Sequence, residues 1–215
     1  MTYKSDVKRG IVPIFSIPLY ITNIGREFTE DELKIFFSDI PMFKEEGMTN
    51  HRSEDLYLFD NFEGLKNIKN FCVHHLEKYL EEIEGADINI ATLRITQSWL
   101  NMTKSQEEHQ PHYHSNSYLS GTLYINCLSN DSINFSNRLY GFSNNNMKFP
   151  VKKETIWNAV VLEQEIKKGD LIIFPSSVLH HVNSNQTKNH VRTSLAFDTF
   201  PIGEMGDTSA THLTL

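Results

Sequence analysis

The sequence predicts a mainly β fold, a sandwich or barrel, with a helical segment before it. Two observations favour this fold class. After Gly85, short apolar stretches alternate with Asn, Gly and Pro residues, a pattern that is typical of the strands of a sandwich or barrel. Before Gly85, apolar residues recur every three or four positions, as they do on the buried face of a helix.

The N-terminal part is expected to contain a strand over residues 12–22 and then a helix that begins at Thr29. This helix start is indicated by a capping box, in which the Thr29 hydroxyl is followed three residues later by Glu32. A short strand is expected over residues 56–59. A longer helix is expected over residues 62–83, because its apolar residues have helical spacing.

The C-terminal part is expected to be a β region, and no linker separates it from the helices. We therefore expect one structural unit over residues 1–215, with a supporting region at 1–87, a β core at 88–200 and a tail at 201–215. The Asn-rich stretch 126–150 is expected to be a surface loop, with a lid over a site as the alternative. The strands of the core are expected at 88–90, 93–100, 118–128, 133–135, 154–161, 170–174 and 190–200.

Composition indicates an ordinary globular protein of 215 residues, with 39% hydrophobic and 22% charged residues. The formal charge of −7 disfavours a nucleic-acid partner. No apolar run reaches the roughly 20 residues of a membrane helix. Pro13 and Pro18 interrupt the apolar stretch near the start, which argues against a signal peptide. Cys72 and Cys127 are expected to be reduced thiols rather than a disulfide, so a cytoplasmic location is expected.

Two histidine clusters are the strongest functional signal. His112 and His114 are two positions apart, so on a strand both side chains would lie on the same face and converge on one ion. His180 follows the apolar strand expected at 170–174, and a loop after that strand can bring its imidazole to the mouth of a barrel. Neutral imidazole is the commonest protein ligand for a transition metal, so these residues are candidate metal ligands.

Arg192 and Ser194 share a face of the last long strand. A buried guanidinium needs an anion, and it forms paired hydrogen bonds with a carboxylate. These two residues are therefore candidates for binding the carboxylate of an organic acid. The alternative is an ion pair within the protein, for example with Asp170 or Asp198.

With these residues in place, the chain resembles the iron(II)- and 2-oxoglutarate-dependent oxygenases, and more narrowly a family of such enzymes found in bacteria and their viruses. The resemblance covers about half of the chain. It rests on the patterns S-W-x-N, H-x-H, S-x-x-S-G-x-x-Y, G-x-L-x-x-F-P-S, H-x-V and R-x-S-x-x-F. These stand here as Ser98–Asn101, His112–His114, Ser117–Tyr124, Gly169–Ser176, His180–Val182 and Arg192–Phe197.

The resemblance implies a double-stranded β-helix, a jelly roll of the cupin kind, with metal ligands at one mouth. It selects His180 over His181 as the third histidine, and it implies that Arg192 and Ser194 bind the distal carboxylate of 2-oxoglutarate. Tyr124 resembles the tyrosine that often donates a hydrogen bond to this cosubstrate. Asn101, with Trp99 near it, is expected to support the bound cofactors.

One position departs from the wider superfamily, in which two histidines and one carboxylate hold the iron. His114 stands where the carboxylate is expected. Either all three imidazoles bind the metal, or His114 lines the pocket and water takes the third position. Glu107, Glu108 and Asp131 are alternative carboxylate ligands, although none has the expected spacing.

The function implied by the resemblance is an Fe(II)- and 2-oxoglutarate-dependent dioxygenase. Such an enzyme decarboxylates 2-oxoglutarate to succinate and forms a ferryl species that hydroxylates an unknown small-molecule or peptide substrate. Two alternatives stay open: a three-histidine metalloenzyme that needs no 2-oxoglutarate, and a non-catalytic jelly-roll binding or structural module. The helices over residues 29–83 would shape the substrate opening or form a homodimer contact.

Overall fold

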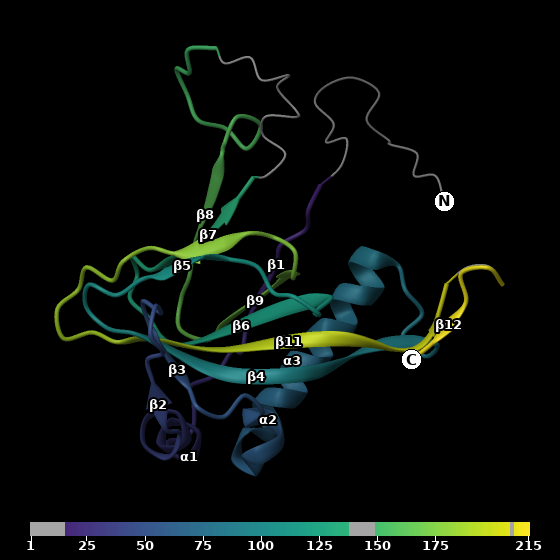
Figure 1. The fold of residues 1–215 in the computed structure, drawn as a ribbon, viewed down its shortest axis with the longest axis horizontal. Coiled ribbons are helices and arrows are strands. Elements are labelled where there is room, and N and C mark those ends of the chain that lie inside the picture. The colour runs from purple at the N-terminus through teal and green to yellow at the C-terminus, as the bar shows by residue number, and fades with distance from the viewer. Residues whose placement is uncertain (1–15, 138–148, 207–208) are drawn as a thin grey trace.

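The computed structural model describes residues 16–137, 149–206 and 209–215 (Figure 1). Two antiparallel sheets contain the strands of this part of the chain. The larger sheet has the order β1 (Tyr20–Asn23), β9 (Asp170–Pro175), β6 (Leu119–Asn126), β11 (Arg192–Met205), β4 (Ala91–Thr103), β3 (His51–Ser53) and β2 (Met42–Phe43). The smaller sheet has the order β5 (His109–His112), β10 (His180–Val182), β7 (Ser132–Ser136) and β8 (Val161–Glu165).

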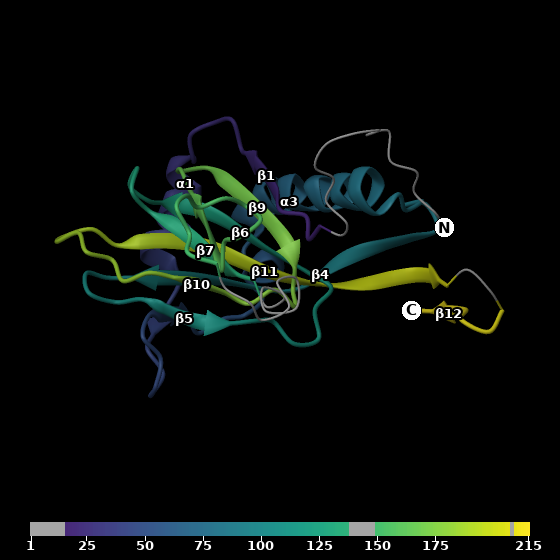
Figure 2. The same cartoon turned by 90° about the horizontal axis from the view of Figure 1, so that it is seen from above.

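The two sheets face each other and form the double-stranded β-helix, so the expected mainly β fold class is confirmed (Figure 2). The chain alternates between the sheets, because β5, β7, β8 and β10 fall between strands of the larger sheet in sequence. The long strand β11 runs between β6 and β4 along the middle of the larger sheet. Its central position brings residues that are far apart in the sequence beside one another.

Helices lie along the outer face of the larger sheet (Figures 1 and 2). The capping box at Thr29 is confirmed, because the backbone N–H of Glu32 donates to Thr29 Oγ1 at 3.2 Å and the Thr29 N–H donates to Glu32 Oε2 at 2.8 Å. The long helix ends at Gly85, whose φ of 65° suits glycine. The helical elements are α1 (Glu30–Lys34) with a π turn at Ile35–Asp39, α2 (Leu58–Asn61), a 3₁₀ turn at Glu63–Leu65, and α3 (Lys66–Tyr79) with a π turn at Leu80–Glu84.

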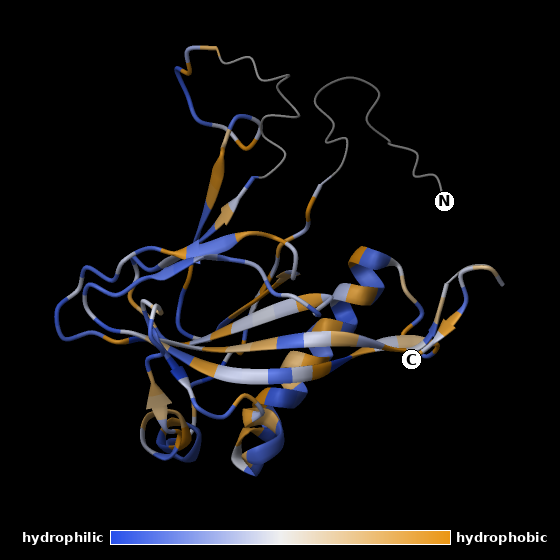
Figure 3. Cartoon of the chain, viewed as in Figure 1, coloured by the Kyte–Doolittle hydropathy of each residue, from blue (hydrophilic) through white to orange (hydrophobic). Residues whose placement is uncertain are grey.

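Strict alternation along the strands separates two apolar cores. On β6, Leu123 and Ile125 belong to the core shared with the helices, whereas Tyr124 belongs to the core between the sheets. On β9, Ile173 packs toward the helices and Phe174 packs between the sheets. Both faces of β9 are buried at Leu171–Phe174, so these residues form a continuous apolar run in the sequence, whereas β6 also carries polar residues such as Ser120 and Thr122 (Figure 3).

Several local predictions were wrong. Residues 58–61 form helix α2 instead of a strand, because Ser98 Oγ accepts the N–H of Phe59 at 2.8 Å and the Asp55 carboxylate accepts the N–H of Tyr57 at 2.7 Å. These acceptors satisfy N–H groups at the start of a helix. Residues 88–90 form a turn, in which the Asp87 carboxylate accepts the N–H of Asn89 at 3.0 Å.

Two further strands start later than expected. The strand expected at 154–161 begins only at Val161, because the segment before it forms a turn in which the Asn158 side chain accepts the N–H of Thr155. The strand expected at 12–22 begins at Tyr20, and its first part lies outside the described residues. Of the stretch 126–150, residues 132–136 form β7, and residues 138–148 lie outside the described part of the chain.

Beyond residue 200, β11 continues to Met205, and β12 (Leu213–Thr214) pairs with it. This pairing lies in the segment that was expected to be a tail. Cys72 and Cys127 are both free thiols, as expected. None of the helices in the described ranges is both long and apolar enough to cross a membrane.

Candidate functional site

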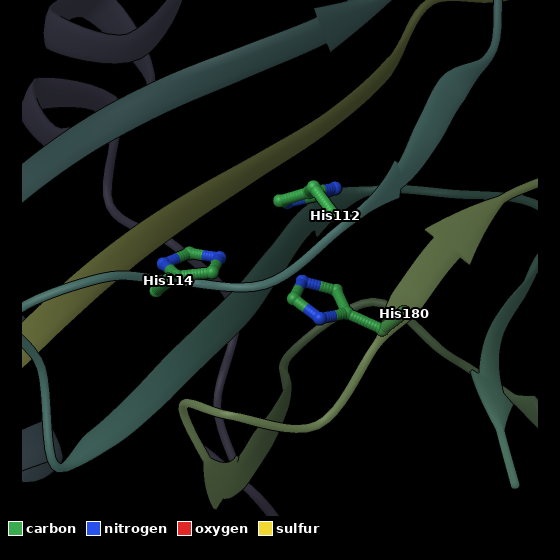
Figure 4. Close-up of side chains that lie close together, drawn as sticks. All are labelled: His112, His114 and His180. Carbon is green, nitrogen blue, oxygen red and sulfur yellow. The ribbon is translucent and has the colours of Figure 1, made fainter. Parts of the chain in front are cut away.

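Three histidines meet at one end of the space between the sheets (Figure 4). His112 is the last residue of β5, and His180, the first residue of β10, is its partner across the pair. His114 lies in the loop after β5, so the expectation that His112 and His114 share a strand was wrong. Nevertheless, one ring nitrogen from each histidine lies within 4.8 Å of the other two.

Hydrogen bonds fix the same tautomer on all three rings. Nδ1 of His112 lies 2.8 Å from the carbonyl oxygen of Gln110, and Nδ1 of His180 lies 2.9 Å from that of Val178. Nδ1 of His114 lies 2.7 Å from Oδ1 of Asp198. Carbonyl and carboxylate oxygens accept hydrogen bonds, so each Nδ1 carries the proton and each Nε2 keeps a free lone pair. The donor set therefore fits a transition metal.

Burial keeps the imidazoles of His112 and His180 neutral. Loss of solvation, followed by the charge of His112, lowers the pKa of His180 from 6.5 to about 2. Loss of solvation also lowers the pKa of His112 below its ordinary value. Metal ligation requires neutral imidazole, so the environment prepares the side chains for this role.

Residues of three neighbouring strands form one wall of a pocket beside the histidines. Ser194 on β11 lies opposite Asn101 on β4 and opposite Tyr124 on β6. Because paired residues point to the same face of a sheet, these side chains form a row toward the space between the sheets. We call this space the inner pocket, and it is lined by Trp99, Asn101, Thr103, His109, His112, His114, Thr122, Tyr124, Ile133, His180, Val182, Arg192, Ser194 and Ala196.

Arg192 lines the inner pocket but also has protein partners. One terminal nitrogen donates to Asp131 Oδ1 at 3.0 Å, and the other donates to the carbonyl oxygen of Asn183 at 2.9 Å. The suggested pairing with Asp170 or Asp198 was therefore wrong, since the carboxylate beside Arg192 is Asp131. A guanidinium has more N–H donors than these two bonds use, so the side chain can still bind a second carboxylate.

The hydroxyl of Tyr124 is the clearest unpaired donor in the inner pocket. It is buried and has no hydrogen-bond partner among the residues that the structure describes. Burial also raises the pKa of this phenol, so the hydroxyl keeps its proton. An unpaired buried hydroxyl is costly, and an acceptor in the inner pocket would remove that cost. This observation fits a carboxylate-bearing cosubstrate.

The alternative carboxylate ligands do not join the histidines. In the described residues, the group that could hold a metal consists of His112, His114 and His180 alone. Asp131 binds Arg192, and Glu107 binds Lys44 at 2.9 Å. Among the described residues, the carboxylate that contacts one of the three rings is instead that of Asp198, which was expected only as a partner for Arg192.

Sequence reasoning also missed His109 and the residues that surround the opening. His109 stacks on His112 with ring centroids 4.2 Å apart, and burial lowers its pKa to about 3. The opening, which we call the outer cleft, shares Trp99, Asn101, His109, His112 and His114 with the inner pocket. Its remaining lining residues are Met48, Asn50, Arg52, Leu56, Gln97, Tyr113 and Asp198. Residues near position 50 carried no motif that could have signalled this role.

Comparison with known families agrees with this geometry. Residues 97–198 match the model of the family described as “Putative 2OG-Fe(II) oxygenase”. Over these residues the chain is similar to the 2OG-Fe(II) oxygenases. The matched segment contains the histidine group, Tyr124 and Arg192.

Solved structures of 2OG-Fe(II) oxygenases share the fold of this chain. An oxidoreductase of the 2OG-Fe(II) oxygenase family from Burkholderia pseudomallei is 11% identical, with a TM-score of 0.55 over 84% of this chain and 83% of that one. HygX from Streptomyces hygroscopicus, solved with nickel, 2-oxoglutarate and hygromycin B, is 12% identical, with a TM-score of 0.53 over 85% and 82%. No curated protein matches the sequence.

The structure gives a physical reason for the serines and the glycine in the oxygenase motifs. The hydroxyl of Ser120 donates to Asp198 Oδ1 at 2.6 Å and lies 2.8 Å from the hydroxyl of Ser176. The hydroxyl of Ser176 in turn donates to that of Ser117 at 2.7 Å. Gly121 lies opposite Phe197, and a Cβ at position 121 would lie 2.0 Å from Cζ of that ring. The serines therefore support the carboxylate behind His114, and the glycine makes room for a core aromatic residue.

Proposed function

We propose that this protein is an iron(II)- and 2-oxoglutarate-dependent oxygenase that hydroxylates a small-molecule or peptide substrate. The observation that carries this proposal is a single pocket lined by the three histidines at one side and by Arg192 and Tyr124 at another. The histidines suit a transition metal, and Arg192 with Tyr124 suits a carboxylate. Few functions other than 2-oxoglutarate-dependent oxygenation need a metal site and a carboxylate site in one pocket.

His112, His114 and His180 would hold the iron through their Nε2 atoms. When bound, iron(II) and 2-oxoglutarate together activate oxygen, and 2-oxoglutarate is decarboxylated to succinate while a substrate C–H bond is hydroxylated. The protein orients each ring through its Nδ1 proton, and burial keeps the imidazoles of His112 and His180 neutral. Three neutral ligands leave positions open for the cosubstrate and oxygen, as a catalytic site requires.

Arg192 and Ser194 would bind the distal carboxylate of 2-oxoglutarate, with Tyr124 as a further hydrogen-bond donor. Asp131 holds the guanidinium from one side, which fixes its position before the cosubstrate binds. Asn101 lies in the same cross-strand row as Ser194 and lines both the inner pocket and the outer cleft. We assign it to the support of bound cosubstrate at the boundary between these two spaces.

The substrate would reach the metal through the outer cleft, because this opening shares its inner lining with the metal-binding histidines. The cleft carries polar groups of both charge signs, including Arg52 and Asp198, beside the aromatic rings of Trp99 and Tyr113. Such a lining suits a polar molecule with hydrogen-bonding groups. Part of the outer cleft is lined by residues between 48 and 56, so the N-terminal region and the β core would form one functional unit.

The two cysteines of the chain, Cys72 and Cys127, are free thiols, which favours a cytoplasmic location.

Release of succinate from 2-oxoglutarate tests the proposal. The full chain, purified without oxygen and loaded with Fe(II), is expected to release succinate under air, slowly without substrate and faster with a suitable one. His180→Ala should abolish this release, and Arg192→Ala should raise the 2-oxoglutarate concentration that it requires. Metal binding without any effect of 2-oxoglutarate would overturn the proposal and indicate a three-histidine metalloenzyme that needs no cosubstrate.

A further inference from the structure

Asp198 is a buried carboxylate directly behind one of the three histidines. It lies on β11, opposite Gln97 of β4 and Ser120 of β6, at the point where the register of the β11–β4 pair shifts. Its side chain is buried, and Oδ1 lies 2.7 Å from Nδ1 of His114. The hydroxyl of Ser120 donates to the same oxygen at 2.6 Å. Two donors therefore converge on one carboxylate oxygen.

The charge of Asp198 is not balanced by a basic side chain. Among the described residues, the only ion-pair partner of Asp198 is His114, and no lysine or arginine nitrogen lies within 4.0 Å. A buried carboxylate without a cationic partner is costly. A positive charge on the other side of the His114 ring would remove this cost. One ring nitrogen of each histidine lies within 4.8 Å of the others, and because Nδ1 of His114 binds Asp198, its Nε2 is the atom left to meet a metal ion there.

We infer that Asp198 supplies, through His114, the negative charge that a carboxylate ligand provides in the usual two-histidine site. This inference rests on the proposed metal-binding function. The hydrogen bond from Nδ1–H to the carboxylate makes the imidazole a stronger donor and fixes its ring orientation. Asp198 is thus a positioning residue that acts on the metal through His114, and the third ligand is His114 itself.

The surroundings of this pair hold both partners in place. The ring of Trp99 lies against His114, with centroids 5.6 Å apart and planes at 30°. The backbone N–H of His114 donates to the carbonyl oxygen of Ser176 at 3.0 Å, so the loop after β5 is fixed although it is not a strand. Rotation of the His114 ring away from Asp198 would therefore break its contact with Trp99.

The metal affinities of two variants distinguish the effect of the charge of Asp198 from the effect of its hydrogen bond. Asp198→Asn keeps an acceptor of similar shape but removes the charge, and Asp198→Ala removes both. We expect Asp198→Asn to lower the affinity for Mn(II) or Fe(II) by about 10- to 100-fold in anaerobic titration, and Asp198→Ala to lower it at least as much. Glu32→Gln, which removes the charge of a buried carboxylate outside the pocket, should leave metal affinity unchanged.

The background His114→Asp provides a sharper test, because it places a carboxylate directly in the ligand position. In this background, Asp198→Asn should no longer lower metal affinity, since the charge it removes is no longer transmitted through an imidazole. A loss of equal size in both backgrounds would overturn the inference and assign Asp198 a general structural role. Unchanged affinity of Asp198→Asn in the native background would overturn it as well.

A spectroscopic readout on the unmodified protein covers the case in which the variants fold poorly. With zinc bound as a diamagnetic probe, the Nδ1 proton of His114 should resonate further downfield than those of His112 and His180, because only its acceptor is a charged carboxylate. Three similar proton shifts would overturn the inference while leaving metal binding intact. A native chain that binds none of these metals would instead overturn the proposed function, and this inference with it.

Discussion

His180 lies directly opposite His112 in the antiparallel pair of β10 and β5, with ring centroids 4.2 Å apart. Backbone pairing therefore sets the distance between these imidazoles before any ion binds. The third ring, that of His114, is held by side-chain contacts and not by strand pairing. The site thus combines two ligands fixed by a sheet with one fixed by a loop.

Replacing His180 should abolish tight metal binding, whereas replacing its neighbour should not. We expect His180→Ala to lower the affinity for Fe(II), Mn(II) or Ni(II) by at least about 100-fold, because one of three ligands is lost. His181→Ala is the matched control, since successive side chains on a strand point to opposite faces and His181 is absent from the histidine group. Calorimetric titration measures both, and equal losses in the two variants would refute the ligand assignment.

Replacing Arg192 should weaken 2-oxoglutarate binding. Arg192→Gln removes a charge-assisted hydrogen bond, each of which contributes about 1.5–3 kcal/mol, so we expect the dissociation constant to rise by about 10- to 100-fold. Ser194→Ala should cost about fivefold, because it removes a single hydrogen bond from an uncharged hydroxyl donor. Titration of the anaerobic Mn(II)-loaded protein with 2-oxoglutarate measures both effects.

The two functions of Arg192 can be separated with a variant of its carboxylate partner. Asp131→Asn removes the charge of that partner but leaves the guanidinium in the inner pocket. We expect it to destabilise the fold while retaining 2-oxoglutarate binding. If Arg192→Gln binds 2-oxoglutarate as tightly as the native chain, Arg192 serves only as a structural partner of Asp131.

The sequence predicted the fold class well, because it follows from short-range patterns. The Thr29 capping box and the strands around Tyr124 and Arg192 are local signals, and the structure has them where they were expected. The candidate metal ligands came from a spacing and a motif, and the structure brings their ring nitrogens together. What each motif residue contacts could not be predicted, because contacts such as Asp198 with His114 join residues 84 positions apart.

The misplaced elements have physical causes that lie outside their own segments. Residues 56–59 have apolar side chains suited to a strand, yet Ser98 from β4 accepts an N–H of the helix that they start. Asp131 was considered as a ligand because of its charge alone, whereas its place beside Arg192 depends on the packing of two strands. Long-range hydrogen bonds of this kind override local propensity.

The capping carboxylate of α1 should make stability depend on pH in the acidic range. Burial raises the pKa of Glu32, but hydrogen bonds from Arg26 and from the backbone of Thr29 outweigh this effect and hold the pKa below its ordinary value of 4.5. The Glu32 carboxylate therefore binds a proton more readily in the unfolded chain than in the folded one. Its contribution to the free energy of unfolding is complete above pH 4.5 and is lost as the pH falls through the lower pKa of the folded state.

Urea unfolding of Glu32→Gln at two pH values measures this contribution. At pH 7 the variant should be less stable than the native chain by about 1–2 kcal/mol, and the difference should shrink in acid as the native carboxylate becomes protonated. Glu30→Gln, on the same turn but exposed, is the control. A difference that stays constant between the two pH values would contradict the assigned pKa shift.

Gly121 should be required because Phe197 occupies the space of its missing side chain. A Cβ at position 121 would lie 2.0 Å from Cζ and 2.5 Å from Cε2 of the Phe197 ring, which is fully buried and cannot move aside. Overpacking of a core costs about 1–3 kcal/mol, so Gly121→Ala should lower the free energy of unfolding by at least that amount. Phe197→Leu should make room, so the double variant should be more stable than the sum of the single effects predicts.

Gly85→Ala is the control for this prediction. A Cβ at position 85 would meet nothing within 4 Å, so the cost of this substitution arises from the positive φ of 65° and Phe197→Leu should not relieve it. Strict additivity of Gly121→Ala and Phe197→Leu in urea unfolding would show that the ring does not set the requirement for glycine.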